Sequence, residues 1–219
     1  MSDREPSNPY HISKERLETM VDAIFAFAMT LLVLGIEIPV FPASQATSEL
    51  PAYIGHLIPQ VIIFVIAFLV LALFWLEHHR QFFYVRVVDP ILLWLNIAIL
   101  IFIVLIPFTT DVSGDYDGIQ IAVILFHVNF LAIGTLFLTH WLYLSRSCHL
   151  CVEDMSHAVA KRRLWLLAFI PICAGIGIAT SFISPSDSLD AYLLIPVFIF
   201  GLTFFMGIRN ETAEFPADE

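Results

Sequence analysis

Ionisable and polar side chains gather in the first turns of the first apolar segment of the chain. Arg16, Glu18, Thr19 and Asp22 lie there, and from Asp22 to Glu37 the only strong hydrogen-bonding side chain is Thr30. Charged groups inside a bilayer cost free energy, so they are functional candidates by default. The pattern predicts either a polar clamp that holds neighbouring helices or a group that handles an ion or a proton directly.

Asp22 requires a partner, because a carboxylate near the hydrocarbon edge is stable only when it is paired, hydrogen-bonded or wet. We expect its partners in the first turns of the same segment, at the end of the second apolar segment and early in the third. The candidates are Arg16, Trp75, His78, His79 and Asn96. Together with Asp22 they form a predicted polar network at the cytoplasmic end of the helices.

The helical period places a second set of side chains on another face of this first segment. Spacings of three, four and seven residues align Phe27, Thr30, Leu31, Leu34 and Ile38, whereas Asp22 lies roughly 140° around the helix from Phe27. An apolar face of this kind packs against lipid or other helices, or it lines a pore that large apolar side chains close by dewetting. The spacing alone leaves both readings open.

Composition sets the class of protein that positions these residues. Of the 219 residues, 59% are hydrophobic and 14% are charged, and the mean hydropathy is +0.85. Soluble domains have an apolar share of roughly 45–50%. We therefore predict an all-α polytopic membrane protein that lies in a lipid bilayer, with six transmembrane helices over residues 16–39, 54–77, 90–110, 118–144, 162–184 and 191–208.

The distribution of charge predicts how these helices are oriented. All ten lysines and arginines fall in the two flanks or in the second and fourth loops, while the other three loops carry only acidic charges. Basic loops stay in the cytoplasm, so both termini are predicted to be cytoplasmic. The domain reading is an N-terminal tail (1–15), one transmembrane domain (16–208) and an acidic C-terminal tail (209–219).

Several of these residues form a motif that resembles a known family. Arg16 and Asp22 are followed by Thr30-Leu31-Leu32-Val33-Leu34 and Pro39, and the second segment ends in Trp75, His78-His79 and Phe82. Asn96 and Pro107-Phe108 in the third segment fit as well. This pattern is similar to the transmembrane protein 175 family of potassium channels over the first three segments, and over the last three by length and topology.

The resemblance implies a potassium-preferring cation channel in the multi-pass cell membrane, of the single-repeat, prokaryotic type, so a prokaryotic plasma membrane is expected. It implies a homotetramer whose first helices line the pore, with the constriction at Phe27, Leu31 and Leu34 and a threonine layer at Thr30. The conventional Thr-Val-Gly-Tyr-Gly filter loop is absent from the sequence. No enzymatic activity, cofactor, metal or nucleic-acid partner is expected, and potassium ions are the expected ligand.

Two positions differ from the family pattern and support an alternative. Met20-Val21 replaces the family's aromatic-serine pair before the aspartate, and Phe27 replaces a smaller aliphatic residue. Four phenyl rings around one axis narrow or close a pore. The alternative function is therefore a structural or sensing membrane protein that keeps the channel fold and does not conduct.

Two further clusters suggest other chemistry. Cys148, His149, Cys151 and His157 carry ligand types that bind zinc, although such a site usually contains a second cysteine pair. His127 and His140 lie thirteen residues apart in one segment, and a haem site would need a matching pair on a second helix. We expect reduced thiols and polar packing at these positions, with the metal and haem readings as alternatives.

Overall fold

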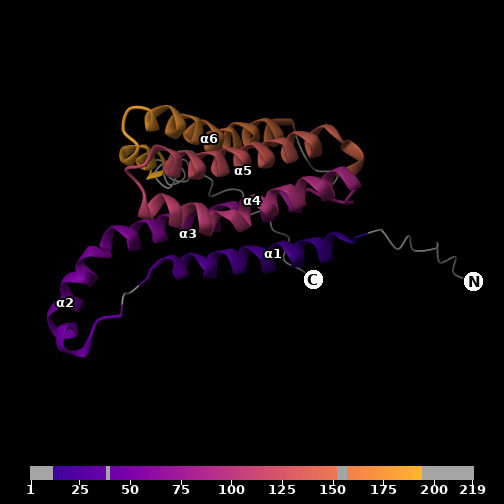
Figure 1. Ribbon diagram of the computed structural model, residues 1–219. Coiled ribbons are helices and arrows are strands. Elements are labelled where there is room, and N and C mark those ends of the chain that lie inside the picture. Colours follow the sequence, from indigo (N-terminus) through magenta and orange to yellow (C-terminus); the bar gives the residue numbers. More distant parts are fainter. Residues whose placement is uncertain (1–11, 38–39, 152–156, 194–219) are drawn as a thin grey trace, which may run out of the picture.

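The computed structural model describes residues 12–37, 40–151 and 157–193, and these residues are helical for most of their length (Figure 1). The α-helices are α1 (Lys14–Leu31), α2 (Ala43–His56), α3 (Ile58–Phe83), α4 (Pro90–Asp115), α5 (Gln120–Arg146) and α6 (His157–Ser181). Short 3-10 helices are η1 (Leu32–Gly35), η2 (Cys148–Leu150) and η3 (Ser186–Leu193). The described residues contain no β-strand.

Five of the helical segments are long and apolar enough to cross a membrane among the described residues. They are Lys14–Gly35, Gln60–Phe83, Pro90–Asp115, Gln120–Arg146 and Arg163–Ser181, and they correspond to the first five predicted spans. Of the sixth predicted span, only residues 191–193 are described, in η3, and the rest lies outside the described residues. The chain is thus an all-helical, multi-pass membrane protein.

Side-chain caps fix where two of these helices begin. Ser13 caps α1, because its Oγ accepts a hydrogen bond from the Arg16 backbone N–H at 3.4 Å. Asp89 caps α4 through a 2.7 Å bond from the Leu92 N–H, and Pro90 occupies the first helical turn, where its missing N–H costs nothing. The other Asp89 oxygen accepts from the Tyr143 hydroxyl of α5, so the same carboxylate also ties α4 to α5.

Three helix boundaries differ from those that the sequence predicted. Residues 40–53 were expected to be a loop, but α2 begins at Ala43, in a stretch where alanine, glutamine and glutamate favour a helix. α3 continues to Phe83 beyond the predicted end at 77 because His78 and Gln81 are buried and hydrogen-bonded inside the bundle. α4 continues to Asp115, beyond the predicted end at 110.

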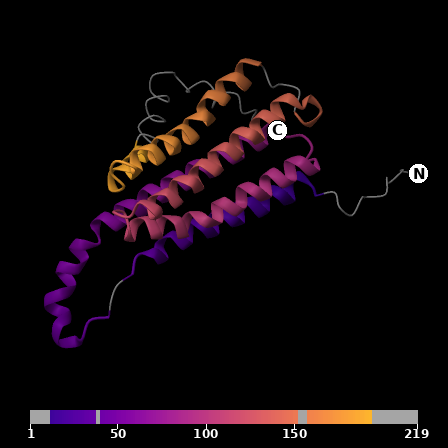
Figure 2. The ribbon, with the colours of Figure 1, turned by 45° about the horizontal axis from the view of Figure 1, so that its top comes forward.

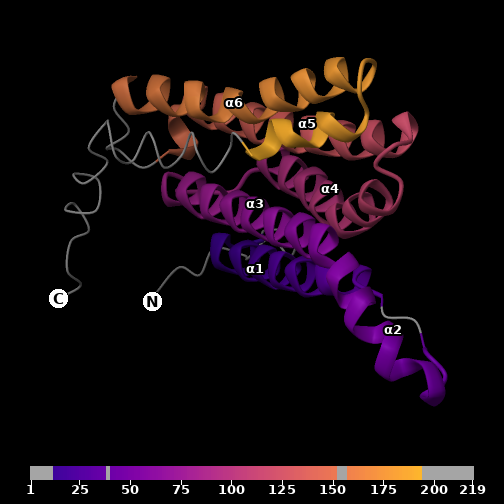
Figure 3. The ribbon, with the colours of Figure 1, turned by 90° about the vertical axis from the view of Figure 1, so that its left-hand side faces the viewer.

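The helices pack in layers with α5 at the centre of the most extensive contacts. α5 packs against α6 on one side and α4 on the other, and α1 lies along α4 and α3 (Figures 1 and 2). The core is aromatic: the Phe74 ring stacks on Phe137 with centroids 5.6 Å apart and meets Phe130 at 5.8 Å. α2 projects away from the other helices and continues into α3 (Figure 3).

Two glycines permit the close approach of neighbouring segments on α5 and α6. A β-carbon at Gly134 would lie 2.7 Å from Pro171 Cδ and 3.0 Å from the Pro171 backbone N, and one at Gly177 would meet the His127 ring. A β-carbon at Gly175 would meet nothing within 4 Å. Small residues of this kind bring membrane helices together.

These contacts predict that a glycine-to-alanine substitution lowers the stability of the protein at one position and not at another. Gly134→Ala forces α5 and α6 apart, and overpacking of this kind costs about 1–3 kcal/mol. Gly175→Ala gains helix propensity of about 1 kcal/mol without a clash. Thermal unfolding in detergent, followed by circular dichroism, should show a lower midpoint for the first variant and an equal or higher midpoint for the second. Equal midpoints for both variants would contradict the close packing at Gly134.

Candidate functional site

α1 has a buried face and an exposed face. Its buried side chains pack on α3 and α4: Leu17, Val21, Phe25, Ala28 and Leu32. Phe27 and Leu34 are 59% and 68% exposed, Thr30 is exposed and Leu31 is half-buried. The structure therefore brings Phe27, Thr30 and Leu34 of the predicted apolar face to the outside of the helix bundle and leaves Leu31 half-buried. The fifth residue, Ile38, lies outside the described residues.

Asp22 lies on another side of α1 and contacts α3. The Trp75 indole Nε1 donates a 2.8 Å hydrogen bond to Asp22 Oδ1, and the His79 ring stacks on Trp75 with centroids 6.3 Å apart. Glu18, Asp22, His78 and His79 line a pocket of about 160 Å³ at this end of the helices. The pocket is polar and large enough to hold several waters beside Asp22.

Asn96 forms the centre of a buried polar network behind this pocket. Its Oδ1 lies 2.7 Å from His78 Nε2, and its Nδ2 lies 3.2 Å from His140 Nε2 and donates to the Leu92 carbonyl at 2.8 Å. His140 Nδ1 lies 2.6 Å from Gln81 Oε1. These side chains come from three helices, α3, α4 and α5, so the network joins the middle of the bundle.

The hydrogen bonds fix the protons on both histidines. Gln81 Nε2 donates to the Phe137 carbonyl, so Gln81 Oε1 accepts and His140 carries its proton on Nδ1. His140 Nε2 then accepts from Asn96 Nδ2, and Asn96 Oδ1 accepts from His78 Nε2–H. Every polar atom of Asn96 is used in this arrangement. In this arrangement the second nitrogen of His78, Nδ1, carries no proton in the neutral ring.

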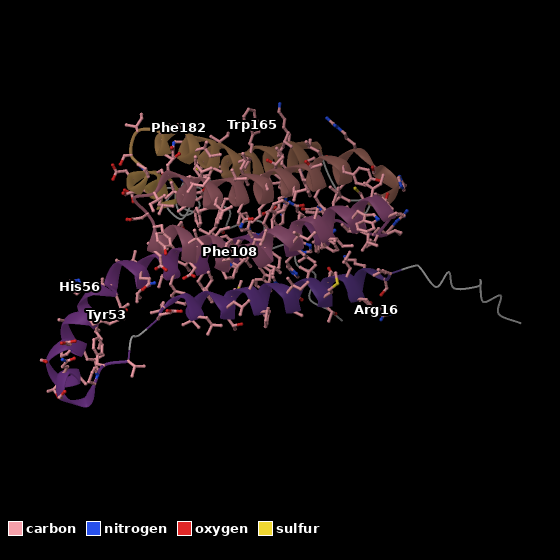
Figure 4. All side chains as sticks on the ribbon, viewed as in Figure 1. Arg16, Tyr53, His56, Phe108, Trp165 and Phe182 are labelled. Atoms are coloured by element: carbon pink, nitrogen blue, oxygen red, sulfur yellow. The ribbon has the colours of Figure 1, made fainter. Side chains whose placement is uncertain are left out.

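Arg16 stands apart from this network. Its side chain is exposed and points away from the bundle at the start of α1 (Figure 4). Among the described residues no ion pair joins it to Asp22. The structure thus brings together Asp22 with Trp75 and His78 with Asn96, and the proposed pairing of Arg16 with Asp22 is not present.

Sequence reasoning missed a charged cluster next to the network. Glu77 of α3 and Arg163 of α6 form an ion pair at 3.3 Å, with side chains only 20% and 13% exposed. The Arg163 guanidinium lies over the Tyr84 and Trp141 rings, 5.3 and 5.4 Å from their centroids. Arginine stacks well on aromatic rings when it is desolvated. The sequence signal was the isolated Glu77 within an apolar run, which sequence reasoning placed at the end of a helix.

The histidines of α5 do not offer a site for haem. His127 uses both ring nitrogens, towards the Tyr192 hydroxyl at 3.0 Å and Ser188 Oγ at 2.9 Å. His140 uses both within the Asn96 network, so neither imidazole has a nitrogen left for iron. In the loop with the predicted metal ligands, the buried Cys151 thiol donates to the Leu144 carbonyl at 3.0 Å. No three histidine, cysteine or acidic side chains come together for a metal in the described ranges.

The network predicts a large difference between two substitutions at this site. Asn96→Leu leaves the Nε2 atoms of His78 and His140 without partners in the core, at a cost of about 2–5 kcal/mol. Trp75→Phe removes one hydrogen bond to the exposed Asp22, worth about 0.5–1.5 kcal/mol. Thermal unfolding in detergent should show a much lower midpoint for Asn96→Leu. Equal losses would contradict the central role of Asn96.

The chain is similar in sequence to a family of potassium channels and to individual bacterial potassium channels. The family model described as "Endosomal/lysosomal potassium channel TMEM175" matches residues 16–107, the part that holds Asp22, the exposed face of α1 and Asn96. A potassium channel of Streptomyces collinus is 29% identical over 189 residues, which cover 84% of this chain and 89% of the relative. A potassium channel of Chryseobacterium is 24% identical, with 84% and 91% coverage.

The chain is also similar to a vertebrate channel and to a solved channel structure. The endosomal/lysosomal proton channel TMEM175 of Gallus gallus is 24% identical over 56% of this chain and 24% of its own length. A crystal structure of a threonine-to-alanine variant of the potassium channel MtTMEM175, in complex with a nanobody-MBP fusion protein, has the same fold. It matches with a TM-score of 0.58 and 18% identity over 95% of this chain and 99% of that chain.

The relatives that match most of the chain come from bacteria, in line with a multi-pass protein of a prokaryotic membrane. The family consists of channels, and the fold, the matched segment and the bacterial relatives agree. The chain is thus similar to the TMEM175 family of ion channels over residues 16–107 and to bacterial potassium channels over 84% of its length.

Proposed function

We propose that the protein is a cation channel that prefers potassium and assembles as a homotetramer, with α1 of each subunit facing the central axis. Phe27, Leu31 and Leu34 form the apolar constriction, and Thr30 forms a polar layer between them. The observation that carries this proposal is the exposed face of α1, where Phe27 and Leu34 are 59% and 68% exposed on a helix whose opposite face is buried.

Two features distinguish this face from an ordinary lipid-facing surface. The family model covers α1, α3 and most of α4, so it includes this face and the helices that support it. The face also contains Thr30, whose hydroxyl donates to the Phe27 carbonyl at 2.7 Å and still has lone pairs available to an ion or to water. A hydroxyl between apolar layers favours contact with a hydrated cation over contact with lipid.

The proposed preference for potassium is based on the names of the bacterial relatives. The bacterial proteins that match 84% of the chain are named potassium channels, and the vertebrate ones are named proton channels. Without a loop of backbone carbonyls, selectivity depends on the width of the pore and on Thr30. Modest discrimination between potassium and sodium is therefore expected.

Phe27 and Val21 favour a second candidate, a membrane protein that keeps the channel fold and does not conduct. Val21 is fully buried and has no hydroxyl to add to the polar network. Four Phe27 rings on one axis would seal it. This candidate predicts no ion flux, even when Phe27 is replaced by alanine.

Flux measurements separate the two candidates. Purified protein in liposomes should dissipate a potassium gradient, and Leu34→Ala should raise the flux by about tenfold, which corresponds to a barrier lower by roughly 1.4 kcal/mol. Ile121→Ala is the control, because Ile121 is 73% exposed on α5 and lies outside α1. No flux from the wild type, Leu34→Ala or Phe27→Ala would overturn the channel proposal.

Cross-linking tests the arrangement of the subunits. A Leu34→Cys variant should form disulfides between subunits under mild oxidation because the four copies face one axis, whereas Ile121→Cys should not. Native mass spectrometry should give four times the 24.8 kDa of one chain. A monomeric or dimeric mass, or equal cross-linking at both positions, would contradict the tetramer with α1 at its centre.

A further inference from the structure

A second polar site lies at the opposite end of α1 from Asp22. Here η1, the start of α3 and the end of α4 line a half-open cavity of about 20 Å³, enough for one water molecule or one ion. Its polar lining comes from Gln60 of α3 and from Thr110 and Asp111 of α4, and Gly35 of η1 forms one wall. None of these residues belongs to the polar network around Asn96.

The amide hydrogens that Gln60 brings to this cavity are already used. Gln60 Nε2 donates to the Gly35 carbonyl at 2.9 Å and to Asp115 Oδ1 at 3.4 Å, so its two amide hydrogens are both engaged. Its carbonyl oxygen is the atom that remains available. Pro107, another lining residue, has no backbone N–H. Apart from the Thr110 hydroxyl, which can both donate and accept, the free polar side-chain atoms of the lining are therefore oxygen acceptors.

Thr110 provides an independent sign of a missing ligand. Its side chain is only 6% exposed and lines the cavity, and its Oγ1 has no hydrogen-bond partner among the described residues. An unpaired hydroxyl buried in this way destabilises the fold unless a water molecule or another ligand satisfies it. The neighbouring Thr109 is different, because its hydroxyl donates to the Ile106 carbonyl at 3.1 Å and accepts from Asn129 at 3.2 Å.

The charge at this site is negative and uncompensated. Asp111 packs so closely on Gly35 that a β-carbon there would lie 2.7 Å from its Oδ1. The charged groups that act on Asp111 are Asp115 and Glu37, and both are acidic. No lysine or arginine occurs between positions 17 and 79 or between 87 and 145, which include every lining residue.

We propose that this cavity binds a single alkali-metal cation such as potassium, held by the Asp111 carboxylate, the Gln60 carbonyl oxygen and the Thr110 hydroxyl. Oxygen ligands suit hard cations. A monovalent ion fits better than a divalent one, because Asp111 is the one acidic residue in the lining, and no three-carboxylate group that could hold a metal occurs among the described residues. The bound ion links α3 to α4 whether or not the protein conducts, and Gln60 in turn holds the Gly35 carbonyl of η1.

Anomalous scattering locates the ion directly. Crystals of the full chain grown with rubidium chloride in place of potassium chloride should give an anomalous peak between Asp111, Gln60 and Thr110. Asp111→Asn crystals should lose it. Rubidium on the symmetry axis without a peak in this cavity would support the channel proposal and overturn this one, and an ordered water without anomalous signal would also overturn it.

Thermal unfolding in detergent gives a second readout that needs no ion flux. Replacing N-methyl-D-glucamine chloride by potassium chloride at equal ionic strength should raise the unfolding midpoint of the wild type by about 2–4 °C. Asp111→Asn and Thr110→Val should each lose at least half of that rise. Asp117→Asn, which removes an exposed carboxylate nearby in the chain, should keep all of it.

The two threonines separate binding from folding. Thr110→Val removes an unpaired hydroxyl, so without potassium its midpoint should equal or exceed that of the wild type. Thr109→Val breaks two hydrogen bonds, so its midpoint should fall, while the rise caused by potassium stays. An equal potassium-dependent rise in the wild type, Thr110→Val and Asp111→Asn would overturn the proposal.

Discussion

The hydrogen bonds of Asn96 are the interaction on which the bundle depends. A polar group inside a bilayer finds no water, so each donor and acceptor needs a partner within the protein. Asn96 forms hydrogen bonds with His78, His140 and the Leu92 carbonyl at once. The other ring nitrogen of His140 needs a partner as well, and Gln81 provides it. Because these partners lie on three helices, a shift of α3, α4 or α5 by one residue would leave several polar groups unpaired. The network therefore fixes the register of the core that supports α1.

The two ends of the bundle handle their polar groups differently. At the end with Asp22, carboxylates and histidines have partners of opposite charge or hydrogen-bonding type, such as Trp75 for Asp22 and Arg163 for Glu77. At the other end, Asp111, Asp115 and Glu37 have only one another as charged neighbours. The first end is thus complete without a ligand, whereas the second depends on solvent or a cation. This difference follows the distribution of lysine and arginine along the chain.

Much of this architecture could be predicted from the sequence because the signals were local. Hydropathy identified the five described membrane-spanning helices, and the helical period separated Phe27 and Leu34 from Asp22. Trp75 was predicted as one of several partners for Asp22 from its level in the membrane, whereas the bond between His78 and Asn96 was not predicted as a pair. Gln81, His140 and Arg163 were not predicted as parts of the network, since their roles depend on contacts between helices distant in sequence. α2 was missed because its weakly apolar sequence gives no membrane signal, although its residues favour a helix.

The change from α1 to η1 at Leu32 has a geometric consequence for the exposed face. A 3-10 helix advances about 120° per residue, compared with about 100° in an α-helix. Over the three steps from Leu31 to Leu34, this tighter winding turns Leu34 by about 60° relative to the position that a continuous α-helix would give it. The angle between the Phe27 and Leu34 side chains around the helix axis is therefore set by the winding of four residues, Leu32–Gly35. A change of this one turn from a 3-10 helix to an α-helix would rotate the Leu34 side chain about the helix axis while Phe27 stayed in place.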